Sequence, residues 1–123
     1  MADNLRELED WVSELKDCNK LIIVEGKKDR IALEKLGIKN IRTLKNPLYK
    51  EVEEIAASCK EVVILTDLDK EGKQLYGRIK KDLARNGVKV DNRFREFLFK
   101  KTKLRQIEGI CTYLQSNLII LEL

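Results

Sequence analysis

Two short apolar runs, each ending in acidic residues and then a glycine, constrain the fold of this chain most. The first, Leu21–Glu25, is followed directly by Gly26. The second, Glu61–Thr66, is followed by the segment DLDKEG at residues 67–72. A short, continuously apolar run such as Val62 to Leu65 is typical of a strand covered on both faces, as in a parallel sheet. The sequence therefore predicts buried strands whose carboxyl ends carry acids.

Segments with helical periodicity alternate with these runs. An alternation of strands and helices predicts right-handed crossovers and a doubly wound sheet. We therefore expect an α/β fold of the Rossmann-like type, a four-stranded parallel sheet flanked by helices. The further strands are expected at Ile41–Leu44 and Val88–Val90, and the helices at Asn4–Lys16, from near Asp29 to Gly37, from Asn46-Pro47 to Cys59, and at Lys70–Arg85.

The chain after Asp91 carries a different pattern. Phe94, Phe97 and Leu98 favour a short helix. A second helix is predicted from a cap at Thr102 through Leu114, and the apolar tail 117–123 is open to three readings: a longer helix, a strand, or a contact with another subunit. At 123 residues the chain suits one domain. We expect its core at about 20–90 and a helical extension at 91–123.

The composition excludes several classes of protein. The chain has no histidine, and its three cysteines (Cys18, Cys59 and Cys111) form no CxxC pair. This argues against a zinc site, a disulfide framework and Ser-His or Cys-His catalysis. No run is long enough to cross a membrane, and the start of the chain lacks a signal-peptide profile, so we expect a cytoplasmic protein that does not engage membranes.

The charge is modest overall but unevenly distributed. The net charge is +4, yet the stretch Arg93–Arg105 holds six basic residues against the single acid Glu96. Such a stretch is either an ordinary solvated face or a surface that touches phosphates. The sequence leaves both readings open.

The acids Glu25, Asp67 and Asp69 are the strongest candidates for chemistry. Positions two apart in extended backbone share a face, so both aspartates can reach one cation. If the two strands are neighbours in a parallel sheet, Glu25 joins them at the same rim. Clustered carboxylates repel one another, and a divalent cation such as Mg²⁺ or Mn²⁺ relieves that repulsion. The alternative is a helix-capping loop, since aspartate is a common N-cap.

Two acidic motifs follow strands in a fixed order: Glu25-Gly26 follows one strand, and Asp67-Leu68-Asp69 follows a later one. With this order and placement, the chain resembles the Toprim domain over about residues 20–90. The stretches VEGKKD and LTDLDKEG look most similar to small stand-alone Toprim proteins and to the ribonuclease that matures 5S ribosomal RNA. The resemblance implies that Asp67 and Asp69 hold Mg²⁺ and that Glu25 is a third ligand or a general acid/base. Gly26 and Gly72 would shape the backbone. Glu71 either replaces a further family aspartate or points away.

From these features we expect Mg²⁺-dependent phosphodiester hydrolysis of nucleic acid, with structured RNA favoured over DNA. Lys27, Lys28 and Lys73 flank the acids and would bind phosphates, although solvated lysines are the plainer reading. Two alternatives stay open: a non-catalytic module that binds nucleic acid or protein, and a primase-like subunit for nucleotidyl transfer. A homodimer or a larger processing complex is compatible with each.

Overall fold

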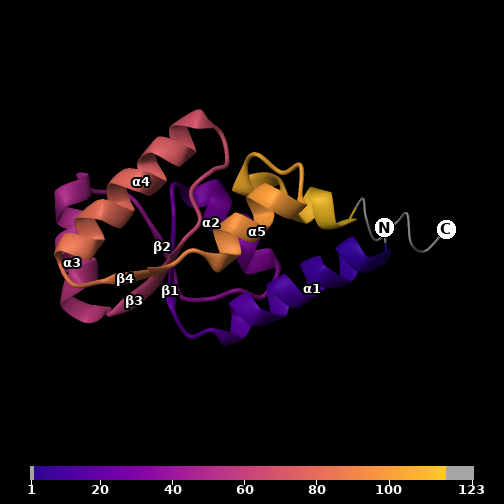
Figure 1. Cartoon of the computed structure of the whole chain (residues 1–123), viewed down its shortest axis with the longest axis horizontal. Coiled ribbons are helices and arrows are strands. Elements are labelled where there is room, and N and C mark those ends of the chain that lie inside the picture. Colours follow the sequence, from indigo (N-terminus) through magenta and orange to yellow (C-terminus); the bar gives the residue numbers. More distant parts are fainter. Residues whose placement is uncertain (1, 116–123) are drawn as a thin grey trace.

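The computed structural model describes residues 2–115 and contains one sheet of four parallel strands (Figure 1). The strands are β1 (Leu21–Val24), β2 (Ile41–Thr43), β3 (Glu61–Ile64) and β4 (Lys89–Asp91). Their order across the sheet is β2-β1-β3-β4, and every pairing is parallel. The expected α/β fold with a four-stranded parallel sheet flanked by helices is confirmed.

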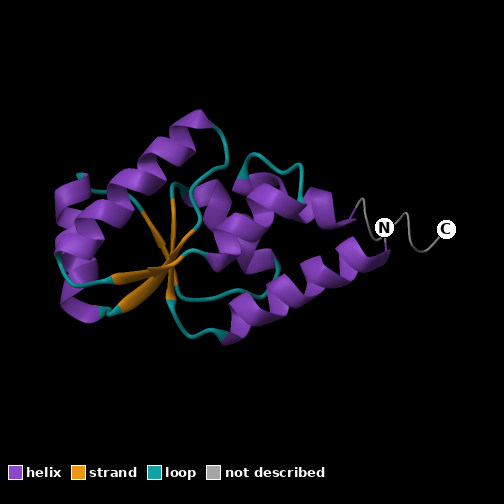
Figure 2. Ribbon diagram, viewed as in Figure 1, coloured by secondary structure: helices purple, strands orange, loops and turns teal. Residues whose placement is uncertain are grey.

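Helices cover both faces of this sheet (Figure 2). Helices α3 and α4 lie on one side, whereas α1, α2 and α5 lie on the other (Figure 1). A short 3₁₀ helix follows α5. The bounds are α1 Ala2–Asp17, α2 Lys27–Lys35, α3 Leu48–Ser58, α4 Lys70–Arg85, α5 Arg93–Lys101 and the 3₁₀ helix Ile107–Gly109.

Alternate residues of each central strand supply two hydrophobic cores. In β1, Ile22 and Val24 belong to the core beneath α1 and α2, whereas Ile23 belongs to the core beneath α3 and α4. All three side chains are at most 1% exposed. Full burial of such a side chain contributes about 1.5–3 kcal/mol. Burial on both faces therefore explains why the strands read as unbroken apolar runs.

The chain reverses its direction of travel across the sheet between β1 and β3. After β1 it adds β2 on one side, then crosses back to place β3 on the other side of β1. The register pairs Ile23 with Ile64, so the two strands end within one residue of each other. In open α/β sheets, the crevice at the carboxyl ends beside such a switch point is where ligands bind. The acids after β1 and β3 lie at this place.

The predicted helix from Thr102 through Leu114 is wrong in its first part. Residues 102–106 have no regular structure, and α-helix resumes only at residues 110–115. The Thr102 hydroxyl donates to the Leu98 carbonyl (2.6 Å) and accepts from the Leu104 N–H (3.2 Å). Thr102 therefore ends α5 instead of starting a new helix. The expectations for the tail 117–123 lie outside the described residues.

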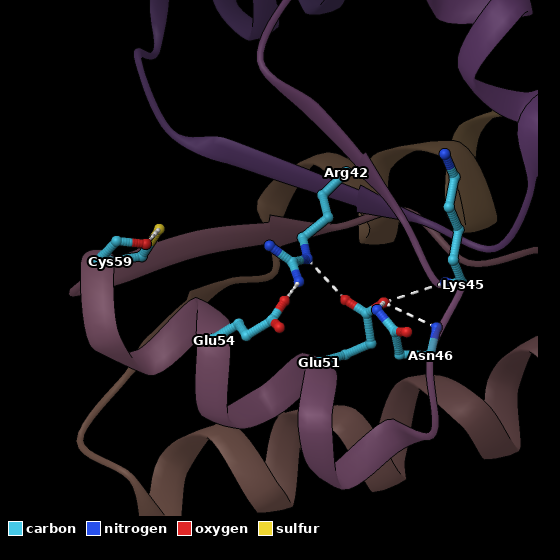
Figure 3. Close-up of polar contacts among 7 residues, drawn as sticks. Arg42, Lys45, Asn46, Glu51, Glu54 and Cys59 are labelled. Atoms are coloured by element: carbon cyan, nitrogen blue, oxygen red, sulfur yellow. Dashed lines mark hydrogen bonds and ion pairs between the residues drawn. The ribbon is translucent and has the colours of Figure 1, made fainter.

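A buried glutamate organises the connection from β2 to α3 (Figure 3). Glu51 is 1% exposed, and one of its carboxylate oxygens accepts the backbone N–H groups of Lys45 and Asn46, each at 3.0 Å. Arg42 pairs with Glu51 (2.7 Å) and with Glu54. Burial alone would raise the pKa of Glu51, but these donors outweigh it and lower the pKa. The buried charge of Glu51 therefore has a structural explanation, because it stabilises the turn before α3.

The three cysteines are free thiols and are partly buried. Within residues 2–115, no helix is both long enough and apolar enough to span a bilayer.

Candidate metal and nucleic-acid site

Glu25 and Asp67 meet across the switch point. Glu25 follows β1 directly, and its Oε1 accepts a hydrogen bond from the backbone N–H of Asp67 at 3.0 Å. The two residues are separated by 42 positions in the sequence. The glutamate side chain therefore points toward residues 67–69, here called the acidic loop. Its hydrogen bond holds the first residue of that loop in place.

Asp67 is also held from the C-terminal part of the chain. Its Oδ1 accepts the backbone N–H of Ile107 at 2.9 Å. The neighbouring Leu68 N–H donates to the Arg105 carbonyl at 2.7 Å. The segment after α5 thus closes over the acidic loop and is part of the site. Sequence reasoning treated this region as a helical extension and did not predict the contact.

Asp69 is the N-cap of α4. Its backbone is extended, and its Oδ1 accepts the N–H of Gly72 at 2.8 Å. This is the capping role that the sequence offered as the alternative to a metal ligand. The two roles are compatible, because capping uses one oxygen. Within residues 2–115, the second carboxylate oxygen of each of Glu25, Asp67 and Asp69 makes no hydrogen bond.

The two glycines beside the acids differ in what they contribute. A Cβ at Gly72 would lie 2.1 Å from the Asp67 carbonyl oxygen, so only glycine lets α4 start this close to the loop. Gly26 lies in extended backbone that other residues adopt, and the nearest atom to a Cβ there would be Asp29 Oδ2 at 4.0 Å. Neither the backbone angles nor the surroundings at Gly26 require a glycine, unlike those at Gly72.

Arg95 is a site residue that sequence reasoning saw only as part of the basic stretch Arg93–Arg105. It is 8% exposed, and its Nη2 donates to the Asp67 carbonyl at 2.7 Å while its Nε donates to the Thr66 carbonyl at 3.4 Å. Burial lowers its pKa from the usual value for arginine, although nearby acids oppose this effect. The Arg95 guanidinium thus positions the backbone at the start of the acidic loop through these two carbonyl groups.

Asp29 is a second residue that the sequence reasoning did not assign to the site. It is 7% exposed, and its Oδ2 accepts the Gly26 N–H at 3.0 Å. An acid at the third position of a helix commonly bonds back to the N-cap N–H, so its position three residues after Gly26 was the signal that could have found it. It adds a fourth carboxylate close to Glu25 and Asp67.

Burial and mutual repulsion raise the pKa of three of these acids. For Glu25 burial is the largest cause, and the charges of Asp67, Asp29 and Asp69 add to it, while the hydrogen bond from Asp67 opposes it. Burial also raises the pKa of Asp67 and Asp29, against the hydrogen bonds that each accepts. Ionised together, these groups are costly, and a cation between them would lower that cost.

The donor set suits Mg²⁺, although no complete cage is formed. Within residues 2–115, no three Asp, Glu, Cys or His side chains gather closely enough to hold a metal ion. Mg²⁺ is commonly bound through one or two carboxylates and keeps several waters. The second oxygens of Asp67 and Asp69 are donors of this kind, whereas Glu25 as a third direct ligand requires a side-chain adjustment.

The remaining predicted residues lie around this cluster. Lys27 and Lys28 are exposed at the start of α2, and Lys73 is exposed in the first part of α4. Their positions leave them accessible to phosphates. Glu71 is exposed in the first turn of α4 and makes no hydrogen bond or ion pair within the described chain.

Comparisons with known proteins show what this chain is similar to. The sequence profile described as "Toprim domain" matches residues 19–92. A UPF0292 protein of Pyrococcus abyssi is 40% identical over 111 residues, which is 89% of this chain and 83% of that protein. A UPF0292 protein of Methanocaldococcus jannaschii is 36% identical over 104 residues, which is 80% of this chain and 81% of that protein.

A solved structure is also similar. It is of a protein from Aquifex aeolicus, with a TM-score of 0.77 and 36% sequence identity. The similarity covers 83% of this chain and 96% of that chain. The resemblance therefore extends beyond the sheet to most of the described domain.

Proposed function

The chain belongs to the Toprim family, and from this membership we propose that it is a Mg²⁺-dependent nuclease that hydrolyses phosphodiester bonds in structured RNA. Toprim membership points to a metal-dependent function related to nucleic acids. The observation that supports the proposal most is the contact of Glu25 with the Asp67 backbone, which holds one acid from each strand at the switch point.

Each acid has a distinct role in this proposal. Bound Mg²⁺ would supply Lewis-acid stabilisation of a phosphoryl oxygen. Asp67 and Asp69 would hold it through the carboxylate oxygens that make no hydrogen bond within residues 2–115. Glu25, whose pKa is raised first by burial and then by its acidic neighbours, is suited to accept and return a proton nearer to neutral pH. Lys27, Lys28 and Lys73 would bind flanking phosphates.

Structured RNA is the preferred substrate class in this proposal, with DNA second. The stretches VEGKKD and LTDLDKEG resemble those of the ribonuclease that matures 5S ribosomal RNA. The exposed Lys100 and Lys101 at the end of α5, and the exposed Lys103 and Arg105 after it, support binding to a phosphate backbone. Action in the cytoplasm, alone, as a homodimer or within a larger processing complex, is part of the same proposal.

The test is a cleavage assay with Mg²⁺ on labelled structured RNA and on DNA of the same sequence. Glu25→Gln and Asp67→Asn each keep an oxygen that can accept the observed backbone hydrogen bond while removing the charge. We expect each to reduce the cleavage rate about 100-fold or more. Glu53→Gln, an exposed acid on α3, is the matched control and should cleave normally. Hydrolysis that survives both site substitutions contradicts the proposal.

A non-catalytic module that binds nucleic acid is the second candidate. One specific observation favours it: each candidate acid already accepts a hydrogen bond from a backbone N–H group and so stabilises the loop. This alternative predicts salt-dependent binding of RNA without turnover at any Mg²⁺ or Mn²⁺ concentration. Glu25→Gln and Asp67→Asn would then leave binding unchanged.

A further inference from the structure

A pocket of 190 Å³ lies between α4 and α5, next to the acidic loop. Its apolar wall is formed by Leu68, Tyr76 and Phe99, and its charged residues include Arg95, Lys73 and Lys80. None of these six except Lys73 was assigned to the site from the sequence. The pocket therefore combines aromatic rings with three cations and one acid, Glu96, in one recess.

Phe99 is the most unusual member of this set. Its side chain is 47% exposed, although it is a large apolar ring. Two cations approach it: the Lys73 ammonium lies 5.8 Å and the Arg105 guanidinium 6.0 Å from the ring centroid. Folding gains little hydrophobic stabilisation from a ring that is left about half in water. The arrangement suits a flat ligand that stacks on the ring and carries negative charge at its edge.

Arg95 and Tyr76 form a second part of the pocket lining, which a hydrogen bond to the acidic loop holds in place. Arg95 stacks over the ring of Tyr76 with 4.5 Å between its guanidinium carbon and the ring centroid, and it is anchored by its hydrogen bond to the Asp67 carbonyl. Lys80 approaches the same ring at 5.8 Å. A fixed guanidinium plane is itself a surface on which bases stack.

The pocket and the acids share one loop. Leu68 lines the pocket and stands between Asp67 and Asp69 in the sequence. Arg95 lines the pocket too, and it holds the backbone of Asp67. A group bound in the pocket would therefore lie next to a phosphodiester positioned at the acids.

We propose that this pocket binds one unpaired nucleobase of the nucleic-acid strand whose phosphodiester lies at Glu25, Asp67 and Asp69. The base stacks on Phe99, and Lys73 and Arg105 neutralise the adjacent phosphates. For the placement of the scissile bond, this inference rests on the proposed nuclease function. It adds a requirement for a single-stranded or splayed nucleotide beside the cleavage position, because a base that is stacked within a duplex cannot enter the recess.

The test measures binding in EDTA, where Mg²⁺-dependent hydrolysis cannot occur. The probes are a short fluorescent single-stranded RNA, its DNA counterpart, and the same strands with abasic residues. We expect the intact strands to bind about tenfold more tightly than the abasic ones, as is typical of one stacked base. RNA and DNA probes together show whether the sugar contributes to binding.

Substitutions at Phe99 identify the stacking surface. Phe99→Leu keeps an apolar side chain but removes the ring, and it should bind the intact strand about tenfold more weakly. Phe99→Trp keeps the ring and should bind at least as tightly as the unaltered protein. Tyr49→Leu, which removes a ring that is 73% exposed on α3, should have no effect. Circular dichroism verifies that each variant is folded.

The outcomes separate the pocket from the nuclease. Equal binding of intact and abasic strands, or no binding of either, overturns the pocket proposal, as does normal binding by Phe99→Leu. Cleavage in Mg²⁺ is scored separately. Cleavage without base-dependent binding refutes the pocket alone, whereas base-dependent binding without cleavage refutes the nuclease and leaves the pocket standing.

Discussion

Each acid at the switch point has a structural role as well as a candidate chemical role. Glu25 accepts from Asp67, Asp67 accepts from Ile107, and Asp69 accepts from Gly72. An amide in the same place keeps an acceptor oxygen and loses only the charge. Substitution to Gln or Asn therefore removes the chemical role and keeps the structural one, whereas substitution to Ala would remove both.

Asp91, at the end of β4, has a purely structural role. It is 8% exposed, and Arg93 (3.0 Å) and Lys20 (2.7 Å) donate to its carboxylate. These donors, the Arg93 hydrogen bonds first, hold the pKa of Asp91 well below its usual range. The folded state therefore stays ionised at pH values where the unfolded chain takes up a proton, so the stabilisation is present above about pH 4 and is lost as the pH falls through the folded pKa.

Asp91→Asn should consequently reduce the free energy of unfolding by about 2 kcal/mol at pH 7 and by less at pH 3. Urea unfolding at both pH values measures the difference. Asp10→Asn, on the exposed face of α1 and outside any ion pair within residues 2–115, should show no such pH dependence. A penalty for Asp91→Asn that stays constant between pH 7 and pH 3 would show that the charge is not its cause.

At the scale of elements, contacts with the start of α4 fix the conformation of the acidic loop. Asp69 caps the helix, the Thr66 hydroxyl donates to the Gly72 carbonyl at 2.7 Å, and the backbone of Gly72 lies against that of Asp67. The close approach needs a residue without a Cβ. The same helix contains Gly77, where a Cβ would meet no atom within 4 Å.

These two glycines form a matched pair for a prediction. Gly72→Ala should destabilise the protein by about 1–3 kcal/mol, because the Asp67 backbone must move to make room. Gly77→Ala should instead stabilise it by about 0.5–1 kcal/mol, since alanine is the better residue inside a helix. Urea unfolding of both variants gives the comparison. If Gly72→Ala proves as stable as Gly77→Ala, the close approach at the loop is not what limits this position.

At the scale of the whole molecule, the region after β4 completes the domain. Phe94, Leu98, Ile107 and Ile110 are at most 2% exposed and belong to the core that contains Val63 and Leu65 of the central part of the sheet. Trp11 of α1 reaches the same region, donating from its Nε1 to the Phe94 carbonyl at 2.9 Å. The Toprim profile ends at residue 92, but the packing continues past it.

A chain that ends at Asn92 should therefore fail to fold. Loss of the four buried side chains removes about 6–12 kcal/mol of burial. That is comparable with the whole stability of a typical domain, about 5–15 kcal/mol. Circular dichroism and size-exclusion chromatography of this fragment and of the full chain test the point. A monomeric fragment with native-like cooperative unfolding would show that residues 1–92 suffice as a core.

The sequence alone determined what depends on local pattern. Unbroken apolar runs specified the strands, helical spacing placed the helices between them, and acids at two strand ends predicted where the candidate site lies. The break at residues 102–106 was missed because a threonine hydroxyl can end a helix as readily as it can begin one.

Only the tertiary structure decided which distant groups complete the site. Arg95 turns inward onto Asp67, and the Ile107 N–H closes on the same residue. Phe99 is left exposed beside Lys73. These contacts join residues from different elements, and their direction depends on how α4, α5 and the 3₁₀ helix pack over the carboxyl edge of the sheet. A periodic pattern in the sequence carries no information about that packing, because hydrogen bonds between remote segments follow from the assembled core.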